Sequence, residues 1–333
     1  MARGRVSLVV LLFLLAGTVA PAGGAPSAPA QAPGNPLAGV RLFVDHGSPS
    51  WHQWRVYRHR GRRRKAALVW KIAREPKAVW VGRFTRPHFR KKVRRLIVAA
   101  RRQGAVPVFT VMRAVSDRCG PAYTAGGPAE DARTRAWYRR LGRTLGNSRV
   151  VIAYEPDSLG TIDCHARSRR DDRLRLLRYG VDVLSRNPNA TIYIEAGASD
   201  WEPARRTARQ LRAVGVAKVR GFMLNATHQD WTRANILHGL KISRLTGGKH
   251  FVINTAENGR GPVHYRRSNG RRITVWCNPP KRKLGATSQL GGGPEMQLWI
   301  KVPGDSDGSC GYGSGVPAGT FSPDLANHLI KGD

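Results

Sequence analysis

Acidic residues are scarce in this 333-residue chain, which has 21 aspartate and glutamate residues against 57 lysine and arginine residues. Cysteine is scarcer, with four residues, and none of them has the Cys-x-x-Cys spacing of a zinc site. The sequence also lacks a phosphate loop, a dinucleotide fingerprint and the Gly-x-Ser-x-Gly motif of many hydrolases. We therefore expect neither a metal nor an organic cofactor.

Long hydrophobic runs are missing too, apart from a short one near the start. Two arginines precede the apolar run at residues 8–16, and small residues follow it. This pattern is typical of a secretory signal peptide, and the run is too short to span a bilayer. We predict a signal peptide and flexible leader over residues 1–30, with cleavage between residues 20 and 30. Residues 37–333 are then expected to form one secreted, soluble domain.

The four cysteines fit export, because an even number in an oxidising compartment favours two disulfides. Cys119, Cys164, Cys277 and Cys310 allow three pairings, and spacing alone does not choose among them.

The formal net charge of +36 comes mostly from arginines, which are dense at residues 55–64, 90–102 and 167–178. Such an excess attracts polyanions such as nucleic acid or an acidic wall polymer. The arginines are spread over helical segments, however, and no recognition helix or aromatic-interleaved groove accompanies them. We expect no specific nucleic-acid partner and keep electrostatic association with an anionic cell wall as an open possibility.

After the leader, apolar strands alternate with segments of helical periodicity. This alternation predicts an α/β fold with a parallel sheet, and seven such units favour a barrel of about seven strands in a single domain. The expected strands are 78–81, 106–112, 150–154, 191–194, 219–224, 251–253 and 298–300, with a short one at 42–45. The expected helices are 89–103, 134–145, 174–187, 203–214 and 231–245, with a basic, helical region at 55–73.

Seven of the 21 acidic residues lie at or just past the carboxyl ends of these strands, where α/β folds place their ligands. The clearest case is the apolar strand at 150–154, which Pro156 ends between two carboxylates. Carboxylates and flat aromatic faces at one rim suit a sugar polymer. The seven acids are Asp117, Glu155, Asp157, Glu195, Glu257, Asp305 and Asp307, joined by Trp201, Asn225, Trp276 and Asn278.

Each of these residues also has a structural interpretation. Asp157 could cap a following helix, and Asp307 could be an ordinary turn carboxylate. Trp201 and Trp276 could be core aromatics, since tryptophan is usually well buried.

The order of the motifs resembles glycoside hydrolase family 6, the cellulases that comprise endoglucanases and cellobiohydrolases. The resemblance covers essentially all of the mature chain, and its first and last motifs are the most specific. The motifs are V-I-A-Y-E-P-D-S-L at 151–159, D-R-C-G at 117–120, Y-T-A-G-G at 123–127, I-E-A-G at 194–197 with Trp201, G-F-M-L-N at 221–225, N-G-R-G-P at 258–262, W-C-N-P-P at 276–280 and L-W-I-K-V-P-G-D-S-D-G at 298–308.

The resemblance implies a distorted parallel β/α barrel that hydrolyses β-1,4-glucan with inversion and without a cofactor. It implies the disulfides Cys119–Cys164 and Cys277–Cys310, and a monomer is expected. Asp157 would be the general acid, Asp307 the base or water organiser and Asp117 the residue that tunes the acid. Sugar-binding positions would be Lys301 and Asp305, with stacking on Trp201 and Trp276 and hydroxyl contacts from Asn225.

This sequence also departs from the family pattern. Asp117-Arg118 has the order of the family's two residues exchanged, which displaces the tuning aspartate by one position. Met112 replaces a tyrosine, Glu195 an aspartate, Ala198 a histidine, Asn254 an aspartate and Glu257 an arginine.

Two interpretations follow. The main one is a secreted, inverting β-1,4-glucan hydrolase, which short loops would leave with an open cleft and endo action. The alternative is a catalytically weakened polysaccharide-binding protein on the same barrel, retained on anionic wall material by its basic surface.

Overall fold

The computed structural model describes residues 1, 34–82, 88–114, 127–270, 272–291 and 293–333. Its main sheet has the strand order β1-β2-β3-β4-β5-β6-β10-β9, and every neighbouring pair is parallel except β10 with β9. The strands are β1 (Val79–Gly82), β2 (Val108–Met112), β3 (Val150–Tyr154), β4 (Ala190–Glu195), β5 (Gly221–Leu224), β6 (His250–Asn254), β9 (Gln289–Leu290) and β10 (Met296–Leu298).

The sheet curls into a half-barrel, which confirms the predicted fold class. Two bonds link its first strand to the segment after β10. The amide of Ala78 donates to the carbonyl of Trp299 at 2.8 Å, and the indole of Trp80 donates to the carbonyl of Ile300 at 2.9 Å. These contacts bring the two edges of the parallel sheet together and so make the barrel distorted rather than evenly hydrogen-bonded.

Strand β3 shows why the sheet is buried on both faces. Val150, Ile152 and Tyr154 belong to the apolar core between sheet and helices, whereas Val151 and Ala153 belong to the core inside the curl. Successive side chains of a strand point to opposite faces, so a continuous apolar run is what two cores require.

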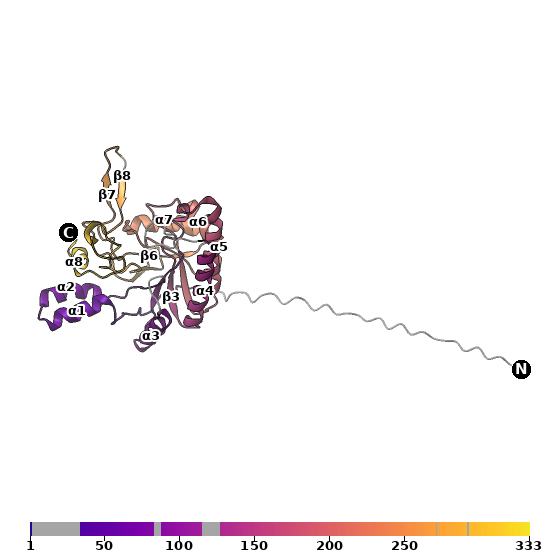
Figure 1. The fold of residues 1–333 in the computed structure, drawn as a ribbon, viewed down its shortest axis with the longest axis horizontal. Coiled ribbons are helices and arrows are strands. Elements are labelled where there is room, and N and C mark those ends of the chain that lie inside the picture. Colours follow the sequence, from indigo (N-terminus) through magenta and orange to yellow (C-terminus); the bar gives the residue numbers. More distant parts are fainter. Residues whose placement is uncertain (2–33, 83–87, 115–126, 271, 292) are drawn as a thin grey trace.

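Five helices follow strands in the alternation that the sequence predicts, and Figure 1 shows α4, α5, α6 and α7 on one side of the sheet. These helices are α3 (Phe89–Arg102), α4 (Pro128–Leu145), α5 (Arg167–Leu184), α6 (Ala204–Ala213) and α7 (Thr232–Leu245). Among the described residues, no helix is long and apolar enough to cross a membrane.

The basic region at 55–73 is helical as expected, and it consists of two helices, α1 (Pro49–His59) and α2 (Arg63–Ala73). Helix α1 begins earlier than expected because the hydroxyl of Ser48 caps it and Pro49 occupies its first turn. Gly61 separates the two helices with a φ of 65°, a backbone conformation that costs glycine little. In Figure 1 both helices lie beside α8 (Pro323–Lys331).

The hairpin of β7 (Val263–Arg266) and β8 (Arg272–Val275), the short strand β9 and helix α8 were not expected from the sequence. The hairpin projects from the body of the molecule in Figure 1. Neither of its strands has a buried face, so no apolar alternation marks them. The last parallel strand lies two residues earlier than expected, and the strand expected at 42–45 is a single bridge from Leu42 to Val106.

Candidate active site

The chain turns sharply just after β3, with both acidic residues in a left-handed backbone conformation. Glu155 has a φ of 55° and Asp157 a φ of 65°, on either side of Pro156. Such a conformation costs a non-glycine residue about 1–3 kcal/mol and persists only where the surroundings enforce it. Strain of this kind is concentrated at functional sites, which makes this turn the centre of the candidate site.

Asp157 is only 6% exposed. The hydroxyl of Thr227, which follows β5, donates to Oδ1 of Asp157. The carbonyl of Asp157 accepts from the amide of Thr161 at 3.0 Å and from its hydroxyl at 2.5 Å. Thr161 thus fixes the backbone of Asp157 from within its own loop, and Thr227 contacts its carboxyl group from the loop after β5.

Glu155 faces a different neighbourhood. Its Oε2 accepts from the amides of Arg113 and Ala114, each at 2.8 Å, and its Oε1 accepts from the hydroxyl of Tyr138 at 2.6 Å. Burial raises the pKa of Glu155 above its usual value, although these hydrogen bonds oppose the shift. Glu155 therefore ties the β3 turn to the loop after β2 and to helix α4.

Glu195, the last residue of β4, lies next to the Asp157 loop. Its Oε2 accepts from the amide of Leu159 at 2.7 Å, and its Oε1 accepts from the amide of Gly197 at 2.5 Å. Burial, and then the negative charge of Asp157, raise the pKa of Glu195 to about 8. A carboxyl group that can hold a proton near neutral pH thus lies beside Asp157.

The other half of the rim is an ionic cluster after β6 and β10. The ammonium of Lys301 lies 2.5 Å from Oδ1 of Asp307 and 3.1 Å from Oε2 of Glu257. The guanidinium of Arg282 pairs with Glu257 and lies 3.7 Å from Oδ2 of Asp307. Burial alone would lower the pKa of Lys301, but the charges of Asp307 and Glu257 raise it overall. Two cations and two anions therefore form one buried, balanced group.

Asp305 lies near this cluster but outside its ion pairs, as far as the described residues go. Its Oδ1 is buried and has no hydrogen-bond partner among the described residues. Burial, and then the charge of Glu257, raise the pKa of Asp305 to about 8. Asp305 is therefore a carboxyl group with one enclosed oxygen that lacks a hydrogen-bond partner among the described residues.

The carboxamide side chains of Asn225 and Asn254 hold strand ends together between the Asp157 loop and the cluster around Lys301. The side chain of Asn225 donates to the carbonyls of Asp230 and Asn254 at 3.1 and 3.0 Å. The Oδ1 of Asn254 accepts from the amides of Ile300 and Lys301 at 2.9 and 3.0 Å. Asn225 is fully buried, so in this structure its amide holds loops together rather than facing a ligand. Its predicted contact with sugar hydroxyls stays a prediction.

The two predicted stacking tryptophans differ. Trp276 is 56% exposed, so its indole is open to a ligand. Trp201 is half-buried, and the ring of His228 stacks on it at 4.6 Å and 9°. Its indole also lies so close to Gly160 that any larger residue there would collide with it. Trp201 thus packs directly on the Asp157 loop, with one face already covered by His228.

The disulfide Cys277–Cys310 is present as predicted. It joins the loop that carries Trp276 to the loop that carries Asp307, whose Oδ2 accepts from the amide of Asn278 at 2.8 Å. Cys164 is also disulfide-bonded. Its predicted partner Cys119 lies outside the described residues, and so does Asp117.

Sequence reasoning missed Thr227, Arg282, Tyr138 and His228, which contact the predicted residues. No local signal distinguishes them, and Arg282 in particular is one of many arginines in this chain. Within the described ranges, no three histidine, cysteine, aspartate or glutamate side chains are grouped so that they could hold a metal ion.

Comparison with known proteins gives this rim its context. The family model described as glycosyl hydrolases family 6 matches residues 37–332. The chain belongs to this family. This family 6 hydrolase is 32% identical over 315 residues to endoglucanase 1 from Streptomyces halstedii, across 92% of this chain and 93% of that one. It is 31% identical to endoglucanase A from Cellulomonas fimi, across 87% of this chain and 61% of the relative.

A solved structure supports the same family assignment. The endoglucanase Cel6 from Mycobacterium tuberculosis, in complex with methyl-cellobiosyl-4-deoxy-4-thio-β-D-cellobioside, superimposes with a TM-score of 0.79 at 37% identity. The match covers 90% of this chain and 99% of that one. This family 6 protein is thus a glycoside hydrolase of the glucanase type, and the alternative of a weakened binding protein receives no support from the comparisons.

Proposed function

We propose that this enzyme is an exported endo-β-1,4-glucanase that inverts the anomeric centre and uses Asp157 as its general acid. The observation that carries the proposal is the turn after β3, which holds Asp157 in a left-handed backbone conformation and buries its carboxyl group against Thr227. A general acid must lie within hydrogen-bond reach of the leaving oxygen, and a braced turn at the strand end provides that fixed position.

An inverting mechanism needs a second carboxylate on the far side of the sugar to activate or orient water. Asp307 is our candidate, with the pairing of its two oxygens to Lys301 and Arg282 in support. Asp305, with its unpaired oxygen, and the exposed Trp276 would bind the sugar. The names of the relatives, endoglucanase in both cases, support endo action.

Replacement of Asp157 by alanine tests the proposal. General acid catalysis contributes about 10²–10⁴-fold to the rate. D157A should therefore lower the rate of reducing-sugar release from carboxymethylcellulose and mixed-linkage glucan by about 10²-fold or more. D324A, in the first turn of α8, is the matched control and should keep wild-type activity. A D157A protein that melts like the wild type and still hydrolyses glucan at the wild-type rate would rule out Asp157 as the acid.

Export and the basic surface belong to the same proposal. The intact mass of the protein recovered from culture medium would show whether cleavage occurs between residues 20 and 30.

Retention of the protein on anionic wall material should fall steeply as salt is added, because its origin would be electrostatic. Retention that does not respond to salt would contradict that role for the arginines.

A further inference from the structure

Trp231, which the sequence analysis did not select, is an exposed aromatic residue outside the predicted site. It lies directly before α7 and is 53% exposed. The edge of its indole packs on the backbone of Gly261, where a Cβ atom would come within 2.2 Å of the ring. The ring is thus fixed in place while much of its surface stays open to solvent.

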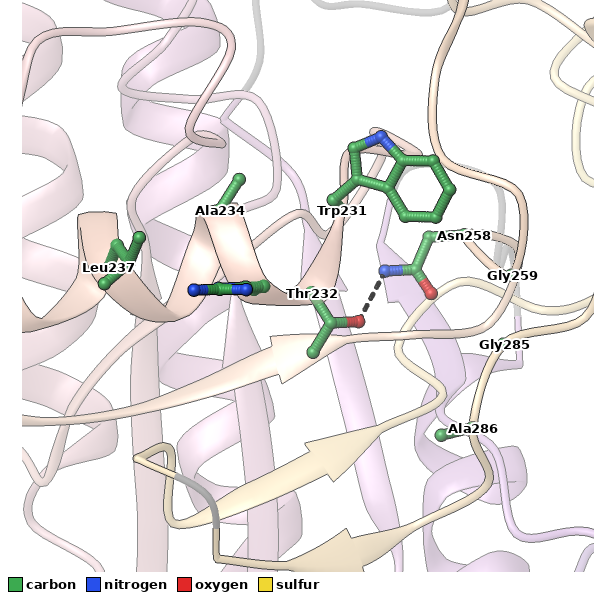
Figure 2. Close-up of a pocket in the computed structure, with 9 residues that line it drawn as sticks. Trp231, Thr232, Ala234, Leu237, Asn258, Gly259, Gly285 and Ala286 are labelled. Atoms are coloured by element: carbon green, nitrogen blue, oxygen red, sulfur yellow. Dashed lines mark hydrogen bonds between the residues drawn. The ribbon is translucent and has the colours of Figure 1, made fainter.

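A cavity of about 590 Å³ lies on one side of Trp231. Figure 2 shows it between the first turns of α7 and the backbone at residues 258–259 and 285–286. Leu237, Ala234 and Ala286 supply apolar wall. Asn258 supplies a polar group, and its amide is oriented by bonds to the hydroxyl of Thr232 at 2.9 Å and to the carbonyl of Asp230 at 3.0 Å.

A second cavity of about 430 Å³ also includes Trp231 in its lining. Its other walls are mostly polar and come from the loops after β4 and β5 and from the β7–β8 hairpin. They are Asp200, Asp230, Pro262, His264, Arg272 and Thr274.

Side-chain contacts connect the second cavity to the candidate active site. Asp200 in its wall contacts the ring of His228 at 3.0 Å, and His228 stacks on Trp201. Trp201 in turn packs on Gly160 in the Asp157 loop. Contacts therefore run from the Asp157 loop through Trp201 and His228 to Asp200, which lines the same cavity as Trp231.

The lining of the two cavities combines apolar, polar and charged residues, and this combination indicates the kind of ligand that fits. A purely apolar ligand would leave Asp200, Asp230 and Arg272 desolvated. The two carboxylates balance the charges of Arg233 and Arg272, so the lining of the two cavities carries no net charge to attract a polyanion. A neutral glucan presents apolar ring faces for an indole and hydroxyls for carboxylate, imidazole and amide groups.

We propose that Trp231 is the platform of an additional binding site for neutral β-1,4-glucan, joined to the active site through Asp200, His228 and Trp201. The identity of the polymer rests on the proposed function. The site binds glucose units beyond those at the cleavage point, so it adds affinity for long chains and none for short ones.

Calorimetric binding of cellohexaose and cellotriose to the D157A protein tests this, because that background prevents hydrolysis. W231A should weaken cellohexaose binding about five- to tenfold, the range of one stacking contact, and leave cellotriose unchanged. W231F should restore part of the loss. Tyr265, an exposed aromatic of the same hairpin that does not line the cavity, provides the control Y265A, which should bind like the parent.

Unchanged cellohexaose affinity in W231A, or an equal loss for both oligosaccharides, would overturn the site. Thermal melting of each variant shows whether the contact with Gly261 matters for folding, and W231F keeps the test decisive if W231A unfolds. The two proposals fail separately. If the wild type releases no sugar, the general-acid proposal fails, while the difference between the two oligosaccharides still decides the role of Trp231.

Discussion

Among the described residues, the hydrogen bonds to the carboxyl groups around Asp157 come from neutral donors, whereas the carboxylates around Asp307 pair with buried cations. Glu155 and Glu195 are held by backbone amides and a tyrosine hydroxyl, and Asp157 accepts from a threonine. Asp307 instead contacts Lys301 and Arg282. The two halves stand at the same rim of one sheet, so this difference in partners separates their chemistry.

The partners of the carboxyl groups limit the chemistry of each part of the rim. A buried carboxyl group among neutral donors can keep its proton near neutral pH, as the pKa of about 8 for Glu195 indicates. A carboxylate that pairs with lysine and arginine, such as Asp307, is held in a fixed orientation. This difference in partners agrees with the proposed roles, proton donation for Asp157 and orientation of water for Asp307.

The largest effect on stability and activity is expected from removing one cation of the cluster around Asp307. Lys301→Met leaves Glu257 and Asp307 with Arg282 as their remaining ion-pair partner within the described cluster. Removing one partner of a buried pair costs about 3–5 kcal/mol, so the free energy of unfolding should fall by that amount and glucan hydrolysis should be largely lost. Denaturant unfolding and reducing-sugar release measure both.

Lys218→Met is the matched control, because Lys218 pairs with Asp182 at 2.6 Å on the surface. A surface pair contributes at most about 1 kcal/mol. Equal losses from the two substitutions would mean that the cluster around Asp307 is not the buried group described above.

A smaller effect is expected from Glu195, and it depends on pH. A carboxyl group with a pKa of about 8 in the folded state and 4.5 in the unfolded state binds more protons when folded over that interval. Its contribution to stability is therefore complete below about pH 4.5 and is lost as the pH rises towards 8. Glu195→Gln should flatten the decline of unfolding free energy between pH 5 and 8 by about 2–4 kcal/mol.

The slope is the quantity to compare, since glutamine loses one hydrogen-bond acceptor and so shifts the absolute stability as well. Asp163→Asn is the control, because a hydrogen bond from Arg206 lowers the pKa of this exposed carboxylate. Its contribution is lost only as the solution becomes strongly acidic, so the slope above pH 5 should not change. An unchanged slope in Glu195→Gln would place the proton elsewhere.

The smallest effect is expected from the neutral donor of Asp157. Thr227→Val removes a hydrogen bond worth about 1 kcal/mol, so kcat should fall several-fold while the melting temperature changes by only a few degrees. Thr227→Ser keeps the hydroxyl and should restore most of kcat. If valine and serine give the same kcat, the bond to Asp157 does not position the acid.

Much of this architecture could be predicted from local patterns. Strand β3 lies where its apolar run predicts, and the rim carboxylates after β3, β4, β6 and β10 follow their strands as expected. The β7–β8 hairpin escaped prediction because it has no buried face. The helical region expected at 55–73 was placed without its division into two helices, which depends on capping at Ser48 and the turn at Gly61.

The partners of the rim residues could not be predicted in the same way. Thr227 lies 70 residues from Asp157 in the chain, and Arg282 lies 25 residues from Glu257. Nothing in the residues around Thr227 or Arg282 indicates these contacts, because they exist only once β3, β5, β6 and β10 are aligned. Trp231 likewise becomes a candidate platform only when the loops at Gly261 and Asp200 are brought to it.

By itself, the sequence determined the parallel strands, the rim that carries the carboxylates and Asp157 as the residue to test first. Those features depend on periodicity and on residues adjacent in the chain. The tertiary structure decided which carboxyl groups hold protons and which pair with cations. That choice depends on burial and on charges from distant segments, and folding alone brings these into contact.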